Sequence, residues 1–190
     1  MKDKIVFVVP CLRSGGAERV MILLANSLVE KGYRIEFIFT MDDVVSYELN
    51  PQIAISINYR NRNPLGQIKF IRKYMRQNKD AIYISFFTYQ NLYTLIAKTF
   101  LPIKVVVSER NDPRKTLYGR RGLEWLRSVL YSGAYKVVFQ TEEAKQFFSR
   151  RIQNKSVMIY NPLSPDLPDI FRGEREKRVV AVARLNKQKN

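Results

Sequence analysis

The sequence predicts an α/β fold with a doubly wound, mostly parallel sheet and helices on both of its faces. Short runs of β-branched and aromatic residues recur along the chain, as is typical of parallel strands that are buried on both faces. Segments with apolar residues at three- and four-residue spacing separate these runs and indicate amphipathic helices. The regular alternation of the two patterns favours right-handed crossovers between neighbouring parallel strands.

The first elements form a strand-helix-strand unit. Ile5–Val9 is a continuous apolar run that Pro10 closes, which predicts a buried strand. Helical spacing of valine and leucine predicts a helix over Ala17–Lys31, and Gly32 suits the position just past its end. The run Arg34–Thr40 predicts the next strand, so one crossover helix connects the two strands of this unit.

The same alternation continues along the chain. We predict further strands over residues 53–57, 81–86, 103–107, 136–140 and 156–160. We predict helices over residues 64–78, 89–100, 119–132 and 142–150. Together these elements predict a Rossmann-like domain over residues 1–161.

The amino-acid composition of the sequence changes after residue 161. Three prolines fall within Asn161–Pro168, and a charged stretch follows, so residues 162–178 are predicted to be a linker. The run Val179–Ala183 then predicts a new buried strand. We expect residues 179–190 to be the first strand and loop of a second, truncated domain.

Composition excludes several classes of chemistry. The 190 residues include no histidine, which excludes Ser-His-Asp hydrolysis, Cys-His proteolysis and histidine-ligated metal sites. The single cysteine, Cys11, excludes an internal disulfide and a cysteine-based zinc site. No apolar run approaches the length of a membrane span, and the first one is too short for a signal peptide. These features favour the cytoplasm.

The charge balance points to polyanionic partners. Lysine and arginine number 33 against 17 acidic residues, which gives a formal net charge of +16. Such a charge attracts nucleic acid, an anionic membrane or a phosphorylated substrate. Basic residues gather in two segments, around residues 60–79 and 110–136, where they favour contact with an anionic membrane. The residues predicted to face the membrane are Lys69, Arg72, Lys73, Arg76, Arg114, Lys115, Arg120 and Arg121.

A glycine turn joins the first strand to the first helix. Gly15 and Gly16, preceded by Ser14, would let backbone N–H groups approach a ligand at the start of a helix. The alternative is a tight turn in which the glycines supply positive φ angles. The turn does not match the G-x-G-x-x-G dinucleotide fingerprint.

Polar residues follow two of the later strands. In an open parallel sheet, loops at the carboxyl ends of strands line the ligand crevice. The candidate catalytic residues after the strand at 103–107 are Glu109, Arg110 and Asn111, although a solvated loop is the alternative. Ser108, Gln140 and Thr141, with Ser14, are predicted to line the same cleft. Thr141 also suits a helix N-cap, which is the favoured interpretation of that position.

The order and spacing of several motifs resemble glycosyltransferase family 4, of the GT-B type. The motifs are Gly15–Arg19, Val107–Pro113, Gln140–Thr141, Tyr160–Pro162 and Val182–Asn190. The resemblance implies one half of a two-domain fold, in which the N-terminal domain mainly holds the acceptor and the C-terminal domain holds a nucleotide-sugar donor. It also implies a retaining reaction.

The resemblance assigns roles to individual residues. Arg184 and Lys189 match the family's donor-diphosphate ligands, and Gly15 and Gly16 match its glycine loop. Many relatives carry a histidine in the loop after the strand at 103–107, where this chain has Glu109–Asn111. That departure leaves the catalytic residue open.

We therefore expect the N-terminal half of a glycosyltransferase that serves surface polysaccharide assembly. Its partners would be a nucleotide-sugar, a lipid-linked or glycan acceptor, an anionic membrane and its own C-terminal domain, with no nucleic acid. It would lie peripherally on the inner membrane face, need no cofactor or metal, and be inactive without its second domain. The alternatives are a basic α/β module that binds nucleic acid or a nucleotide without catalysis, and a nucleotide-dependent oxidoreductase, which the missing fingerprint disfavours.

Overall fold

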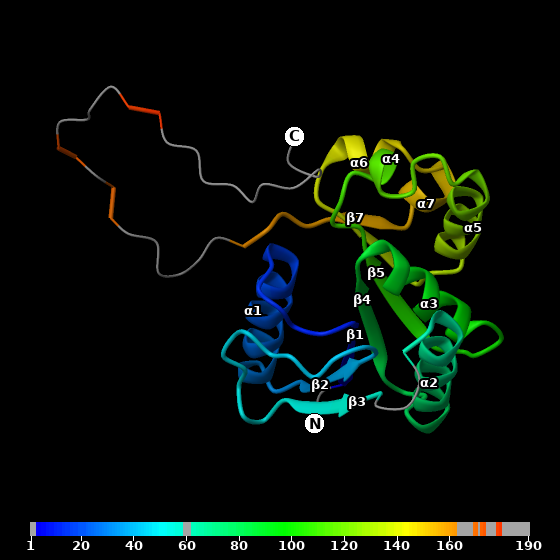
Figure 1. Cartoon of the computed structure of the whole chain (residues 1–190), viewed down its shortest axis with the longest axis horizontal. Coiled ribbons are helices and arrows are strands. Elements are labelled where there is room, and N and C mark those ends of the chain that lie inside the picture. The colour runs from blue at the N-terminus through cyan, green and yellow to red at the C-terminus, as the bar shows by residue number, and fades with distance from the viewer. Residues whose placement is uncertain (1–2, 59–61, 163–168, 171, 174–177, 180–190) are drawn as a thin grey trace.

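The structure is a computed structural model that describes residues 3–58, 62–162, 169–170, 172–173 and 178–179. Within these residues, seven strands form one sheet in the order β3-β2-β1-β4-β5-β6-β7. Every pairing between neighbouring strands is parallel. Helices lie on both faces of the sheet (Figure 1), which confirms the predicted fold class.

The elements follow one another in strict order along the chain. The strands are β1 (Lys4–Val9), β2 (Arg34–Phe39), β3 (Ala54–Ile57), β4 (Ile82–Phe86), β5 (Lys104–Ser108), β6 (Lys136–Phe139) and β7 (Ser156–Met158). The helices are α1 (Gly16–Glu30), α2 (Pro64–Gln77), α3 (Thr88–Lys98), α4 (Pro113–Thr116), α5 (Arg121–Ser132), α6 (Glu142–Gln146) and α7 (Arg150–Gln153).

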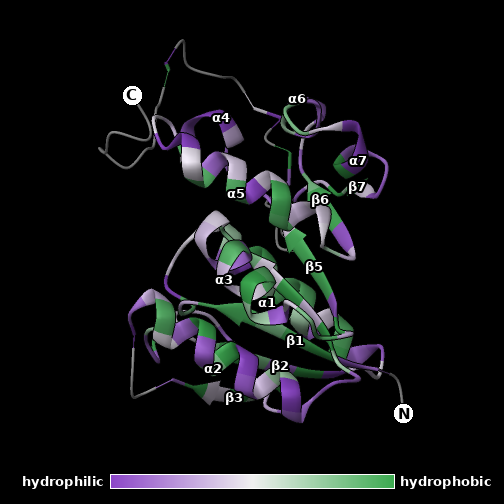
Figure 2. Cartoon of the chain, turned by 90° about the vertical axis from the view of Figure 1, so that its right-hand side faces the viewer, coloured by the Kyte–Doolittle hydropathy of each residue, from purple (hydrophilic) through white to green (hydrophobic). Residues whose placement is uncertain are grey.

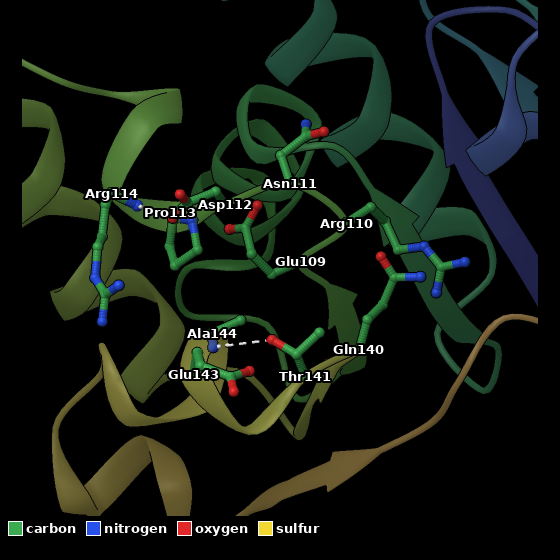
Figure 3. A pocket seen from close by; sticks show the side chains of 10 residues that line it. All are labelled: Glu109, Arg110, Asn111, Asp112, Pro113, Arg114, Gln140, Thr141, Glu143 and Ala144. Carbon is green, nitrogen blue, oxygen red and sulfur yellow. Dashed lines mark hydrogen bonds between the residues drawn. The ribbon is translucent and has the colours of Figure 1, made fainter. Parts of the chain in front are cut away.

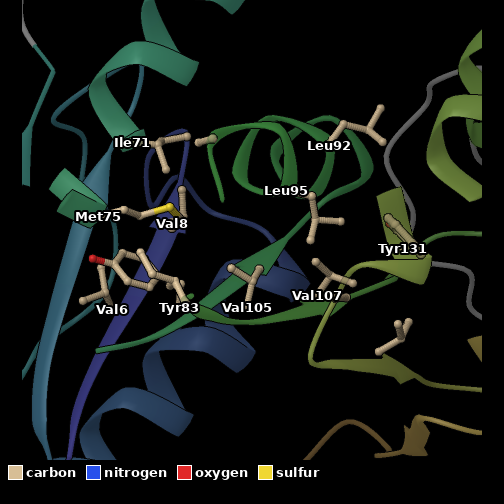
Figure 4. Close-up of a cluster of buried hydrophobic side chains, with 14 of the residues drawn as sticks. Val6, Val8, Ile71, Met75, Tyr83, Leu92, Leu95, Val105, Val107 and Tyr131 are labelled. Atoms are coloured by element: carbon tan, nitrogen blue, oxygen red, sulfur yellow. The ribbon is translucent and has the colours of Figure 1, made fainter. Parts of the chain in front are cut away.

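Alternation along β1 divides the core into two layers, because successive side chains of a strand point to opposite faces. Phe7 and Val9 pack with the buried face of α1, and the rings of Phe7 and Phe37 stack with centroids 5.0 Å apart. Val6 and Val8 belong to the opposite layer with α2, α3 and α5 (Figure 4). Figure 2 shows apolar strands at the centre and polar residues on the outer sides of the helices.

The direction of each crossover explains this division. The β1-to-β2 crossover moves one way across the sheet, whereas the crossovers from β3 onwards move the other way. Right-handedness therefore places α1 on one face and the later helices on the opposite one. On the α1 face, an apolar groove of about 400 Å³ lies beside α1, with Val20 and Leu23 on one wall and Ile84, Val106 and Val138 on the sheet.

Several boundaries differ from those predicted. The helix expected over 142–150 is two short helices, because Phe148 turns inward to stack on Tyr131 and Ser149 is the N-cap of α7, which begins at Arg150. Helix α4 was not predicted either; Asp112 caps it by accepting the Arg114 N–H at 3.0 Å. Gly32 has φ of 82°, which confirms its predicted place after α1. The predicted linker and last strand fall largely outside the described residues, so the domain division stays a prediction.

A polar cluster closes the amino end of the sheet. Lys4 Nζ lies 2.8 Å from Glu36 Oε2 and also donates to Asn78 Oδ1. Ser56 Oγ donates to Glu36 Oε1 at 2.7 Å. Burial alone would raise the pKa of Glu36, but the hydrogen bonds from Lys4, Tyr74 and Ser56 outweigh it and hold that pKa below its ordinary value.

Replacing Lys4 with methionine should destabilise the domain in a pH-dependent way. We expect Lys4→Met to lose ~1–2 kcal/mol of unfolding free energy near neutral pH, since the buried carboxylate of Glu36 loses its charged donor. The loss should shrink as pH falls through the lowered pKa of Glu36, because protonation removes the interaction from the wild type as well. Urea unfolding across pH measures this, with the exposed Lys31→Met as control; a pH-independent difference would contradict it.

Candidate functional site

Parallel pairing brings the carboxyl ends of all described strands to one edge of the sheet. A pocket of about 290 Å³ lies at this edge, between the segments that follow β5 and β6. The residues that line it, drawn in Figure 3, are Glu109, Arg110, Asn111, Asp112, Pro113, Arg114, Gln140, Thr141, Glu143 and Ala144. Two segments some thirty residues apart thus build one polar cavity.

Glu109 comes directly after β5, yet its carboxylate is buried. The residue is 1% exposed, and its two carboxylate oxygens accept hydrogen bonds of 2.7 Å from Thr88 Oγ1 and from Tyr131 Oη. Burial raises the pKa of Glu109, although these hydrogen bonds, the charge of Arg127 and the Asn111 N–H act against the rise. The geometry suits a carboxylate that anchors its loop, and its predicted catalytic role stays untested.

Arg110 lies at the boundary between the pocket and the apolar groove and lines both. Its guanidinium stacks on the Phe86 ring at 4.8 Å and donates to Asn161 Oδ1. Gln140 donates to the same Asn161 oxygen, so one amide bridges the segments after β5 and β6. Burial lowers the pKa of Arg110. Arg110 and Gln140 are therefore held in fixed positions at the rim.

The floor of the pocket includes the start of α6. Thr141 caps this helix, because its hydroxyl accepts the Ala144 N–H at 3.2 Å. The Glu143 carboxylate, which also lines the pocket, has a pKa lowered by its own backbone N–H and by the Thr141 hydroxyl. The predicted capping role of Thr141 is confirmed, and its side chain borders the pocket as well.

The glycine turn lies at the same edge of the sheet, after β1, but it does not line this pocket. Gly15 is extended, with φ of −157°, and Gly16 begins α1, so the alternative in which both glycines supply positive φ is wrong. Tyr47 fixes the turn: its hydroxyl accepts the Gly15 N–H and donates to the Gly15 carbonyl, both at 3.0 Å. Ser14, beside it, is exposed.

The structure thus brings together Glu109, Arg110, Asn111, Gln140 and Thr141, while Ser108 borders the adjoining groove. Arg184 and Lys189 lie outside the described residues, and their assigned role stays a prediction. Sequence reasoning missed Tyr47, Arg127 and Tyr131 as supports of the edge, because their partners lie far along the chain. Among the described residues, no three cysteine or acidic side chains gather as metal ligands would.

Comparison with known proteins identifies the family. A match to the family described as Glycosyltransferase Family 4 spans residues 14–167. The chain belongs to glycosyltransferase family 4. A curated relative from Campylobacter jejuni, GalNAc-alpha-(1->4)-GalNAc-alpha-(1->3)-diNAcBac-PP-undecaprenol alpha-1,4-N-acetyl-D-galactosaminyltransferase, is 23% identical over 98% of this chain and 54% of its own length. This family 4 chain therefore spans about half the length of that relative.

Several solved structures share the fold. The UDP complex of Anabaena Alr3699/HepE superposes with a TM-score of 0.64 at 14% identity, covering 84% of this chain and 44% of that one. The lipopolysaccharide outer core galactosyltransferase WaaB gives a TM-score of 0.65 at 14% identity, over 85% and 46%. Acinetobacter baumannii MurG gives 0.59 at 17% identity, over 87% and 47%. The family 4 chain corresponds to one half of each fold.

The buried carboxylate beside the pocket predicts an unusual pH dependence of stability. Because the pKa of Glu109 is raised in the folded state, wild-type stability should fall as pH rises from the unfolded value of about 4.3 through the folded value. Glu109→Gln cannot ionise, so its unfolding free energy should improve relative to wild type over that range. Chemical denaturation at stepped pH measures the difference.

Glu143→Gln is the matched control, because the pKa of Glu143 is lowered and the sign reverses. Stability of this variant relative to wild type should fall as pH rises. If both variants gave the same trend, the account of Glu109 would be wrong.

Proposed function

We propose that this family 4 chain is the acceptor-side half of a glycosyltransferase that moves a sugar from a nucleotide-sugar to a lipid-linked or glycan acceptor. The observation that supports this most is the polar pocket at the carboxyl edge of the sheet, which amide, hydroxyl, guanidinium and carboxylate side chains line together. Such groups form hydrogen bonds with sugar hydroxyls. Asn111 and Gln140 would contact the acceptor directly. Arg110 would interact with negative charge on the acceptor.

The donor would be held chiefly by a second domain that faces this edge across a cleft. In this proposal, Arg184 and Lys189 neutralise the donor diphosphate, where negative charge develops on the leaving group and cations lower the barrier. Gly15 and Gly16 approach the reacting groups from the acceptor side. The transfer retains configuration at the sugar carbon and depends on no metal, and this half alone is inactive because it holds only one wall of the cleft.

The name of the Campylobacter jejuni relative describes an undecaprenol-linked glycan as its substrate. By analogy, we propose a lipid-linked glycan as the acceptor here, within surface polysaccharide assembly. The alternative function, a basic α/β module that binds nucleic acid or a nucleotide without catalysis, is not favoured. The family match spans most of the chain, from residue 14 to residue 167.

A lipid-linked acceptor requires contact with a membrane, and an exposed surface suits that contact. Around α4 and α5, the side chains of Tyr118 and Trp125 are 85% and 68% exposed, which favours the interface over the core for these two rings. Arg114, Lys115, Arg120 and Arg121 lie close to them in the sequence and are exposed, although Arg120 also donates to Tyr89.

The basic residues of α2 belong to a helix that packs on the same face of the sheet as α5. Lys69, Lys73 and Arg76 are exposed there, whereas Arg72 donates to the carbonyls of Ala97 and Thr99 at the end of α3. Within the described part of the chain, no helix is both long and apolar enough to cross a bilayer. We propose peripheral attachment to the inner face of the membrane through these two basic surfaces.

Alanine substitution of the two donor cations tests the proposed reaction. In the complete polypeptide of the encoding gene, Arg184→Ala or Lys189→Ala should lower kcat for nucleotide-sugar transfer by about a hundredfold, as loss of a transition-state charge contact does. Product formation from a labelled UDP-sugar panel measures this. Lys31→Ala, on the far end of α1, should leave the rate unchanged; wild-type rates in both donor variants would refute the assigned roles.

Membrane attachment is tested by sedimentation with vesicles. Arg121→Gln should weaken binding to anionic vesicles by about fivefold, because each basic residue near the surface contributes ~1 kcal/mol. Lys31→Gln removes the same charge from a helix on the other face of the sheet and should bind as the wild type does. Equal binding of the wild type to neutral and anionic vesicles would exclude this mode of attachment.

A further inference from the structure

The loop 109–113 supplies half of the residues that line the pocket, and it has buried contacts at both ends. At its start, the Glu109 carboxylate accepts a hydrogen bond of 2.7 Å from the Tyr131 hydroxyl. At its end, the Pro113 carbonyl accepts a hydrogen bond of 2.9 Å from Arg127 Nη2. The loop therefore does not depend on its own sequence alone for its shape.

Both outer contacts come from one face of α5. Arg127 and Tyr131 are four residues apart, so they lie one above the other on the helix. Both are 0% exposed. Their i, i+4 spacing lets one rigid helix reach the first and the last residue of the loop at the same time.

Neither contact is explained by simple core packing. An arginine with no exposed surface costs free energy unless it is compensated, and here its Nε and Nη1 atoms have no hydrogen-bond partner among the described residues. The cost of burying the Arg127 guanidinium is offset by the rings of Phe147 and Phe148, whose centroids lie 5.1 and 5.2 Å from Arg127 Cζ. The nearby Glu109 carboxylate contributes as well.

Tyr131 is likewise part of a network and does more than fill space. Its hydroxyl accepts Asn91 Nδ2 at 2.9 Å while it donates to Glu109, and its ring stacks on Phe148. Asn91 also donates to the Ser108 carbonyl at 3.0 Å and accepts from Ser85. The network thus joins the ends of β4 and β5 to α3 and α5.

We propose that Arg127 and Tyr131 are positioning residues, which hold the pocket-lining loop 109–113 at its two ends from a single helix. This proposal rests on the proposed function of the pocket as the acceptor site. In this arrangement Tyr131 and Thr88 each restrain one carboxylate oxygen of Glu109, the first residue of the loop. The side chains of Arg110 and Asn111 are thereby presented to the acceptor without being ordered at the moment of binding.

Hydrogen exchange of the Glu109 amide tests the hold directly, because that N–H donates to the Val138 carbonyl at 2.9 Å and becomes accessible when the start of the loop moves. Tyr131→Phe keeps the ring that stacks on Phe148 and removes only the hydroxyl. We expect exchange at Glu109 to accelerate by about tenfold, the factor that the loss of one buried hydrogen bond gives, while the amides of β1 keep their protection. Tyr135→Phe, the same change at an exposed tyrosine just past α5, should alter neither.

Two results would overturn the proposal. One is unchanged exchange at Glu109 in Tyr131→Phe, and the other is an equal acceleration of the β1 amides, which would mean global destabilisation. Thr88 gives an independent arm: Thr88→Val removes the donor to the Glu109 carboxylate and should accelerate exchange of the Glu109 amide, whereas Thr88→Ser keeps a hydroxyl and should restore its protection.

Transfer assays on the complete polypeptide test whether the restraint of loop 109–113 affects the reaction rate. Tyr131→Phe should lower kcat about tenfold with little change in the KM of the nucleotide-sugar, since the donor is held elsewhere. A loosened loop with unchanged kcat would contradict a positioning role. If the wild type transferred no sugar, the proposed function would fail, yet the exchange measurements on the 190-residue chain would still decide whether α5 holds the loop.

Discussion

Parallel pairing of the strands is the constraint on which the rest of the molecule depends. Because every pairing runs in the same direction, the carboxyl ends of β1, β4, β5 and β6 share one edge, and the segments that leave them meet there. Right-handed crossovers then decide which face each helix covers. The pocket is a product of this geometry, since the segments after β5 and β6 are distant in sequence but belong to neighbouring strands.

Much of the fold could be predicted because each strand carries its own signal. A strand buried on both faces is a continuous apolar run, as in Ile5–Val9, and that pattern needs no tertiary context. Helix ends and breaks were harder to predict. The break between α6 and α7 depends on Phe148 packing against Tyr131 and Phe139, which lie on other elements, so no local pattern around residue 148 marks it.

The location of the pocket was predictable from the polar residues after two strands, but the orientation of their side chains was not. Glu109 is a conspicuous acid in an exposed-looking loop, and its inward turn is decided by Thr88 and Tyr131, which lie 21 and 22 residues away in the sequence. The bridge from Asn161 to Arg110 spans 51 residues. Burial and partners at such separations follow from the assembled fold, whereas the sequence shows only which side chains are present.

Helix α5 carries one set of buried side chains and one set of exposed side chains on different sides of its axis. Arg127 and Tyr131 are enclosed beneath the pocket, while Arg121 and Trp125 are exposed to solvent about a third of a turn away around the helix axis. Substitutions on one side thus leave the other chemically intact. The outward positions can diverge without disturbing the inner pair, so the charge of this surface and the geometry of the loop are free to evolve independently.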